Sequence, residues 1–231
     1  MNLVMFDIDG TLTATTDIDE RCFVRAVEDT LGIVDIDTNL ANYTHVTDEG
    51  IAAEIIGRHT GRGATDSEVA GIRGHFVGLI EQCTENQPEL FRPIAGAREM
   101  LGILSERPGC SVSLATGGWR DSAILKLRVA GLDVGAMPIA TSDDAHSREG
   151  IMQLSETRAQ RVYDVAGFDS VIYVGDGVWD VRSTKALGYR FIGVAEGDRA
   201  SQLRTEGAEH IVSDFAKENG FWDILEALLE K

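Results

Sequence analysis

The sequence predicts an α/β fold in which a doubly wound parallel sheet, a Rossmann-like core, carries a small α-helical domain. Short apolar runs typical of buried strands alternate with segments of helical periodicity, and such alternation is typical of a parallel sheet. One long stretch near the N-terminus breaks the alternation and shows helical patterns alone. At 231 residues, the chain is long enough for one such domain with an insertion.

The predicted strands are short apolar runs that end at polar or glycine-rich turns. The first of these runs ends at Asp7, and the same pattern recurs later in the chain. Strands are predicted over residues 3–6, 111–115, 171–174, 190–194 and 210–212.

The predicted helices of the core lie between these strands. They are expected over residues 96–104, 121–130, 148–165, 178–187 and 221–229. The last of them carries an apolar stripe, which indicates packing against the core rather than binding of a partner.

Residues 15–91 contain apolar positions at helical spacing and no convincing strand. Pro88 and Pro93 bracket the return of the chain to the core, where helices tend to stop. We therefore predict that residues 1–14 and 92–231 form the α/β catalytic core and that residues 15–91 form a helical cap domain.

The charge of the chain argues against polyanionic partners. Lys and Arg number 21 against 38 Asp and Glu, which gives a net charge of −17. The long-range field therefore repels nucleic acid and anionic membrane surfaces. A small phosphorylated molecule is not excluded, because a metal ion and local cations can reverse the field inside a pocket.

The cysteines and the N-terminal residues predict a cytoplasmic protein. Cys22, Cys83 and Cys110 are widely spaced and include no C-x-x-C pair, so neither a disulfide framework nor a zinc site is expected. The N-terminal apolar run has no basic residues before it and is broken at Asp7. No apolar stretch approaches the length of a membrane span.

Acidic residues follow two of the predicted strands. Asp7 and Asp9 lie two residues apart, about 6.6 Å between Cα atoms on an extended backbone, with side chains on the same side. Asp176 and Asp180 follow a later strand. Asp-Gly after a strand is also a common turn signal. However, strand ends meet at one edge of a parallel sheet, and carboxylates gathered there require a hard cation, for which Mg²⁺ is the natural choice.

A second candidate cluster is Thr116-Gly117-Gly118, which follows the strand at residues 111–115. A hydroxyl group and exposed backbone N–H groups before a helix can bind phosphoryl oxygens. The same sequence also occurs in purely structural turns, so it indicates a phosphate site only together with the acidic residues.

These motifs, in this order, resemble those of the haloacid dehalogenase superfamily. Asp7–Thr11 resembles the first motif, Thr116 the second, Arg148 the third, and residues 175–180 the fourth. The resemblance covers the whole chain, and residues 15–91 resemble the helical cap that one branch of the family inserts after the first motif.

The resemblance implies a role for each motif residue. Asp7 would be the nucleophile and Asp9 the general acid and base. Mg²⁺ would be held by the Asp7 carboxylate, the Asp9 backbone carbonyl and Asp176, with Asp180 beside them. The third motif usually supplies Lys; here Arg148 keeps the positive charge but has a planar, forked shape.

The function implied is a magnesium-dependent phosphatase of a small phosphorylated metabolite, acting through an aspartyl phosphate. We hypothesise that closure of the cap desolvates Asp9 and favours its neutral form. A sugar-phosphate mutase, similar to β-phosphoglucomutase, remains an alternative with the same residues. A haloacid dehalogenase is less favoured, because a halide leaving group needs no acid such as Asp9. A phospho-accepting signalling domain is also less favoured, because its motifs follow a different order along the chain.

Substrate selection is expected in the cap and beside the second motif, where a resemblance places Thr47-Asp48 over the active site. The substrate candidates are Thr47, Asp48 and Trp119, followed by Tyr43, His45, Arg62 and Arg120. The sequence leaves open whether the protein is a monomer or a homodimer.

Overall fold

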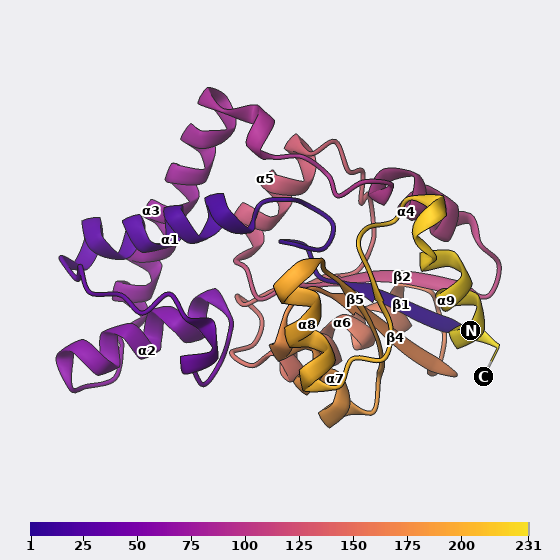
Figure 1. Cartoon of the computed structure of the whole chain (residues 1–231). Coiled ribbons are helices and arrows are strands. Elements are labelled where there is room, and N and C mark those ends of the chain that lie inside the picture. The colour runs from indigo at the N-terminus through magenta and orange to yellow at the C-terminus, as the bar shows by residue number, and fades with distance from the viewer. Residues whose placement is uncertain (231) are drawn as a thin grey trace.

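A computed structural model describes residues 1–230 and contains a six-stranded sheet (Figure 1). The strand order is β3-β2-β1-β4-β5-β6, and every neighbouring pair is parallel. The chain therefore builds one half of the sheet outward from β1 and then the other half, which is a doubly wound arrangement. The strands are β1 (Asn2–Phe6), β2 (Cys110–Ala115), β3 (Ile139–Ala140), β4 (Ser170–Gly175), β5 (Arg190–Val194) and β6 (Ile211–Val212).

The helices agree with the predicted alternation. Within the described residues, no helix has both the length and the apolar character needed to cross a membrane. The α-helices are α1 (Thr16–Leu31), α2 (Asp48–Thr60), α3 (Asp66–Asn86), α4 (Ala97–Glu106), α5 (Arg120–Val129), α6 (Arg148–Val162), α7 (Val178–Leu187), α8 (Gly197–Glu206) and α9 (Phe221–Leu229). Short 3₁₀ turns lie at Leu40–Asn42, Pro88–Leu90 and Lys217–Asn219.

Both faces of the sheet are covered by helices, as the continuous apolar strands predict. In β1, Val4 and Phe6 belong to the apolar cluster that includes α4, α5 and α9. Leu3 and Met5 point to the opposite face and pack with α6. The alternation of side chains along β1 thus connects the two apolar layers of the core.

Helices α1, α2 and α3 gather in a lobe beside the sheet (Figure 1). We call residues 15–91 the helical lobe and retain them as the proposed cap. The two chain connections to the lobe run side by side, because the N–H of Ala14 donates to Arg92 O and that of Ile94 to Leu12 O. Within the lobe, the thiols of Cys22 and Cys83 lie 3.8 Å apart, between α1 and α3.

Candidate active site

A cavity of about 350 Å³ opens between the helical lobe and the carboxyl ends of β1, β2 and β4. In doubly wound sheets ligands bind at this edge, where successive strands depart in opposite directions. Predicted site residues from both parts of the chain line the cavity: Asp7, Asp9, Thr116, Gly117, Gly118, Arg148 and Asp176 from the core, and Thr47 and Asp48 from the lobe.

Three buried carboxylates lie together at this edge. One oxygen each of Asp7, Asp176 and Asp180 lies within 4.8 Å of the others. Asp7 follows β1, Asp176 follows β4, and Asp180 lies in the first turn of α7. Burial, followed by the charges of Asp7 and Asp180, raises the pKa of Asp176 well above its ordinary value. Burial also raises the pKa of Asp180, to about 7.

The donor set of these carboxylates fits a hard divalent cation. Within the described residues, Oδ1 of Asp7 and Oδ1 of Asp180 are buried and accept no hydrogen bond. Three clustered carboxylates, two of which have an unsatisfied buried oxygen, favour an additional counter-charge, and oxygen ligands are those that Mg²⁺ prefers. The side chain of Asp9 lies outside this group, so only its backbone carbonyl remains as the ligand implied by the resemblance.

Gly10 permits the close approach of the first and fourth motifs. Its φ is +76°, and a Cβ atom at this position would lie 2.0 Å from Oδ2 of Asp176. Gly10 is therefore required both for the turn and for the packing of Asp176. Any side chain at this position would displace Asp176 from its place beside Asp7.

Arg148 supplies the positive charge beside these acids. It is buried at the start of α6, with Nη1 at 3.4 Å from Asp7 Oδ1 and 3.5 Å from Asp180 Oδ1. Burial alone would lower the pKa of Arg148, but the charges of Asp7 and Asp180 outweigh it and raise this pKa. Arg148 thus places a buried positive charge beside Asp7 and Asp180.

Arg199, in α8, is a cation of the site that the sequence did not indicate. Its Nη1 lies 3.0 Å from Oδ2 of Asp176, and about half of its side chain is exposed. Helix α8 was itself not predicted, because only Ala200 and Leu203 of its residues are buried and give it little apolar periodicity.

Asp9 faces a second buried cation, Lys126 of α5. Lys126 Nζ donates to Asp9 Oδ2 at 2.6 Å and also to Asp19 of α1. The hydroxyl of Thr15 donates to the other Asp9 oxygen. Burial alone would lower the pKa of Lys126, but the carboxylates of Asp19 and Asp9 raise it. Burial raises the pKa of Asp19 to about 6 despite this contact.

Lys126 was missed by the sequence analysis, although a signal existed. The buried face of α5 includes Ser122, Ala123, Lys126 and Leu127, which follow helical spacing. A lysine on an apolar helix face is almost never fully buried without a partner. Its position therefore indicated an ion pair, but not which carboxylate would provide it.

The Thr116-Gly117-Gly118 loop lies beside the acids and lines the cavity. Thr116 Oγ1 accepts from the N–H of Gly118 at 3.1 Å, which leaves its hydroxyl hydrogen able to donate to an anion. Gly117 is needed for packing, since its Cβ would lie 2.8 Å from Val46 O of the helical lobe.

Thr47 and Asp48 dock the helical lobe onto the core. The N–H of Asp48 donates to Gly117 O at 2.8 Å, and Asp48 Oδ2 accepts from the N–H of Trp119 at 2.9 Å. The Thr47 hydroxyl donates to His146 O at 2.8 Å. Burial, followed by the charge of Asp19, raises the pKa of Asp48 well above its ordinary value.

The side chain of Trp119 does not line the cavity. It is fully buried between Phe23 and Phe76 of the helical lobe, and its Nε1 donates to Glu49 at 3.0 Å. A large aromatic side chain between two packed layers stabilises their contact. Trp119 therefore belongs to the interface between the helical lobe and the core, and its side chain is not a substrate contact.

The remaining substrate candidates lie in different settings. Tyr43 lines the cavity, and its hydroxyl donates to Asp37 O at 2.6 Å. Arg62 and Arg120 are held elsewhere, by Glu68 and by Asp144 respectively. His45 does not line the cavity.

The assembled groups suit the transfer of an anionic group to a carboxylate. Asp7 offers an oxygen beside a cation, Arg148, and the carboxylates of Asp7, Asp176 and Asp180 could together hold a metal ion. Asp9 lies on the same cavity wall as a group able to accept or deliver a proton.

Several solved structures share the fold of the whole chain. Among solved structures, a hydrolase from Pseudomonas syringae is 21% identical, with a TM-score of 0.74 and coverage of 100% of this chain and 99% of that chain. A protein assigned as a beta-phosphoglucomutase from Bacteroides vulgatus is 18% identical, with a TM-score of 0.71 and coverage of 100% and 91%. A protein assigned as a phosphoglycolate phosphatase from Haemophilus somnus is 15% identical, with a TM-score of 0.61 and coverage of 98% and 97%.

Identities of this size establish a shared fold and no more. No curated protein matches the chain significantly. A family model described as haloacid dehalogenase-like hydrolase, however, matches residues 1–188, which is most of the chain. The protein therefore belongs to the haloacid dehalogenase-like hydrolases and is an enzyme of the hydrolase class.

Proposed function

We propose that the protein is a magnesium-dependent phosphatase of small phosphorylated metabolites, which passes the phosphoryl group through a covalent bond to Asp7. The observation that carries this proposal is the placement of Asp7. Its buried carboxylate lies with Asp176 and Asp180 within 4.8 Å and with Arg148 at 3.4 Å, at the wall of the cavity. A nucleophile, a metal site and a cation for phosphoryl oxygens thus occupy one place.

In the first step, an oxygen of Asp7 attacks phosphorus and the bond from phosphorus to the leaving oxygen breaks. Asp9 is ion-paired with Lys126 in the structure, so it must take up a proton before this step; in its neutral form it delivers that proton to the leaving oxygen, and the product alcohol leaves neutral. Arg148, the Thr116 hydroxyl and the amides of Gly117 and Gly118 offer donors to the phosphoryl oxygens. Their placement before the reaction avoids reorganisation during it.

In the second step, a water molecule attacks the phosphorus of the aspartyl phosphate. Asp9, which now lacks its proton, takes one from this water, and the bond between phosphorus and Asp7 breaks. Inorganic phosphate leaves, and both carboxylates return to their initial forms. Lys126 keeps the Asp9 side chain directed into the cavity through both steps.

The chemistry of the metal is limited to charge neutralisation and orientation. When bound among Asp7, Asp176 and Asp180, Mg²⁺ would supply positive charge to a phosphoryl oxygen and allow these carboxylates to remain ionised. The raised pKa of Asp176 is the cost of gathering these acids, and a divalent ion offsets it.

The proposal is tested with a panel of phosphorylated metabolites and p-nitrophenyl phosphate, assayed with and without Mg²⁺. We expect hydrolysis to require Mg²⁺, because three carboxylates otherwise repel the substrate. The variant Asp7→Asn keeps the size of the side chain and removes the nucleophile. It is expected to lower kcat by about 10⁴-fold or more.

A control variant, Asp169→Asn, removes an exposed carboxylate far from the cavity and should leave kcat unchanged. Turnover by Asp7→Asn at the parent's rate would contradict the covalent route. Product analysis separates the two activities that these residues permit, since a phosphatase releases inorganic phosphate and a mutase returns an isomeric sugar phosphate.

A further inference from the structure

The cavity wall carries many more carboxylates than cations. Seven carboxylate side chains and two arginines line it. Arg148 lies against Asp7 and Asp180, and Arg199 lies against Asp176. Among the residues that the structure describes, no cation of the wall is without a carboxylate neighbour. Both arginines of the lining therefore already have carboxylate partners.

In the proposed reaction the core residues Asp7, Thr116 and Arg148 hold the phosphoryl group, which leaves the part of the wall supplied by the helical lobe for the alcohol portion of the substrate. This part of the wall contains both apolar residues, such as Phe23, and acidic residues. Its acids are Asp19, Glu20, Asp37 and Asp48. The lobe contributes no Lys, Arg or His to the described lining.

The surroundings of Asp48 indicate which substrate groups this part of the wall can bind. It is buried, and Oδ2 accepts from the Trp119 N–H, whereas no donor of the described residues bonds Oδ1. Burial, followed by the charge of Asp19, raises the pKa of Asp48, although Lys126, which pairs with Asp19, opposes this shift. A further anion would add to the repulsion between Asp19 and Asp48, and a hydroxyl or ammonium donor would relieve it.

We propose that the enzyme selects phosphate monoesters whose alcohol portion carries hydroxyl or ammonium groups and no second anionic group. This inference rests on the proposed phosphatase function and narrows its substrate class. Polyol, sugar and amino-alcohol monophosphates belong to the class. Bisphosphates and phosphorylated carboxylic acids do not, because their second anion would face the carboxylates of the helical lobe.

The test uses compounds that differ only in this second group, as competitive inhibitors of p-nitrophenyl phosphate hydrolysis. Glycerol phosphate is compared with phosphoglycerate, and hydroxyethyl phosphate with phosphoglycolate and with ethanolamine phosphate. We expect the neutral and cationic compounds to have inhibition constants at least about tenfold lower than their carboxylate partners. Inhibition reports binding whether or not a compound is also hydrolysed.

A charge reversal on the wall supplies the second arm. Glu20, on α1, is exposed and lines the cavity. Glu20→Lys should improve inhibition by phosphoglycerate relative to glycerol phosphate by about threefold or more. The control Glu81→Lys makes the same charge change at an exposed residue of α3 that does not line the cavity. It should leave the ratio of the two inhibition constants unchanged.

Three results would overturn the substrate class: equal inhibition within a pair, tighter binding of the carboxylates, or a ratio that Glu20→Lys does not move. Arg199→Gln identifies the source of a reversed preference, since a carboxylate bound by Arg199 would lose its advantage in this variant. Hydrolysis of p-nitrophenyl phosphate that survives Asp7→Asn contradicts the phosphatase function instead. Asp7-dependent hydrolysis with a preference for phosphoglycerate contradicts only the substrate class.

Discussion

Lys126 determines how Asp9 is held. Its side chain is fully buried and does not line the cavity, and it forms ion pairs with Asp9 and with Asp19. Lys126 thus connects the proposed general acid and base in the core with α1 of the helical lobe. It is a positioning residue, because it reaches the substrate only through Asp9.

Lys126→Met keeps most of the side-chain volume and removes the charge. Removing one partner of a buried ion pair leaves uncompensated charge, so we expect the free energy of unfolding to fall by about 3–5 kcal/mol. We also expect kcat to fall by about tenfold or more, since Asp9 loses its orientation. Urea unfolding and steady-state kinetics measure the two effects, and the exposed Lys217→Met serves as the matched control.

The double variant Lys126→Met/Asp19→Asn separates stability from catalysis. It removes one of the two uncompensated carboxylates and should recover part of the lost stability. It should not recover kcat, because Asp9 still lacks its ammonium partner. A parent-like kcat in Lys126→Met would contradict the positioning role.

Individual residues of the candidate site could be predicted from the sequence where they directly follow an apolar strand. Asp7, Thr116 and Asp176 each follow such a strand, and the topology of a parallel sheet brings strand ends to one edge. Arg199 had no such marker, because a half-exposed arginine on a polar helix resembles many others. Its contact with Asp176 depends on the packing of α8, which the sequence does not show.

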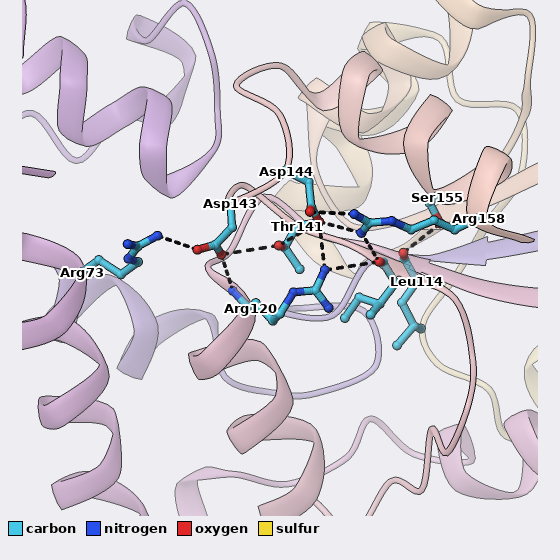
Figure 2. A network of polar contacts seen from close by, with 9 residues as sticks. Arg73, Leu114, Arg120, Thr141, Asp143, Asp144, Ser155 and Arg158 are labelled. Atoms are coloured by element: carbon cyan, nitrogen blue, oxygen red, sulfur yellow. Dashed lines mark hydrogen bonds and ion pairs between the residues drawn. The ribbon is translucent and has the colours of Figure 1, made fainter. Parts of the chain in front are cut away.

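The loop between β3 and α6 connects the elements around the site. Figure 2 shows Arg73 of α3 directed toward Asp143, and Arg120 and Arg158 directed toward Asp144. These contacts fix the loop that leads into α6, whose first residue is Arg148. The anchoring of this loop therefore contributes to the placement of the cation beside Asp7.

Asp144→Asn tests this anchor through its pH dependence. Hydrogen bonding from Arg158 lowers the pKa of Asp144 from 3.8 to about 2. A lowered pKa stabilises the fold above pH 3.8, and this contribution is lost as the pH falls toward about 2. We expect Asp144→Asn to lower the free energy of unfolding by about 2 kcal/mol at neutral pH.

Urea unfolding of both proteins at neutral pH and at a series of values below pH 4 measures this effect. The difference between parent and Asp144→Asn should shrink across the acidic range, whereas the exposed Glu209→Gln should differ little from the parent throughout. A difference that stays constant as the pH falls would show that the charge of Asp144 does not anchor the loop.

Elements with a clear apolar pattern were predicted within a few residues, and the weakly patterned ones were missed. β1, β4 and α7 match their predicted ranges closely. β3 has only two residues, so no apolar run marks it; it is held by pairing with β2. α8 lacks an apolar stripe because most of its surface is exposed.

At the scale of the whole molecule, the sequence predicted the doubly wound core and the interruption of its alternation by helices. It did not predict how the helical lobe meets the core. That contact depends on backbone groups, such as the Asp48 N–H with Gly117 O, and on the aromatic cluster around Trp119. Backbone hydrogen bonds leave little trace in residue type, and a buried Trp119 resembles a substrate contact when its neighbours are unknown.

The helical lobe and the core together line the cavity in which the proposed chemistry occurs. Val46 O accepts from Arg148 Nε at 3.1 Å, so the same arginine contacts both the lobe and Asp7. The burial of Arg148 and Asp7 strengthens the electrostatic interaction between them. The proposed reaction requires Asp7 to carry the phosphoryl group in this cavity.

The most direct test locates the phosphoryl group during turnover. The Asp9→Asn variant is mixed with p-nitrophenyl phosphate and Mg²⁺, quenched in acid, digested and examined by mass spectrometry. This leaving group needs no proton, so the first step proceeds, whereas attack by water lacks its base and the covalent form accumulates. We predict one phosphoryl group on the peptide that contains Asp7. Release of phosphate with no phosphorylated peptide at any time, or a phosphoryl group on another residue, would contradict the account.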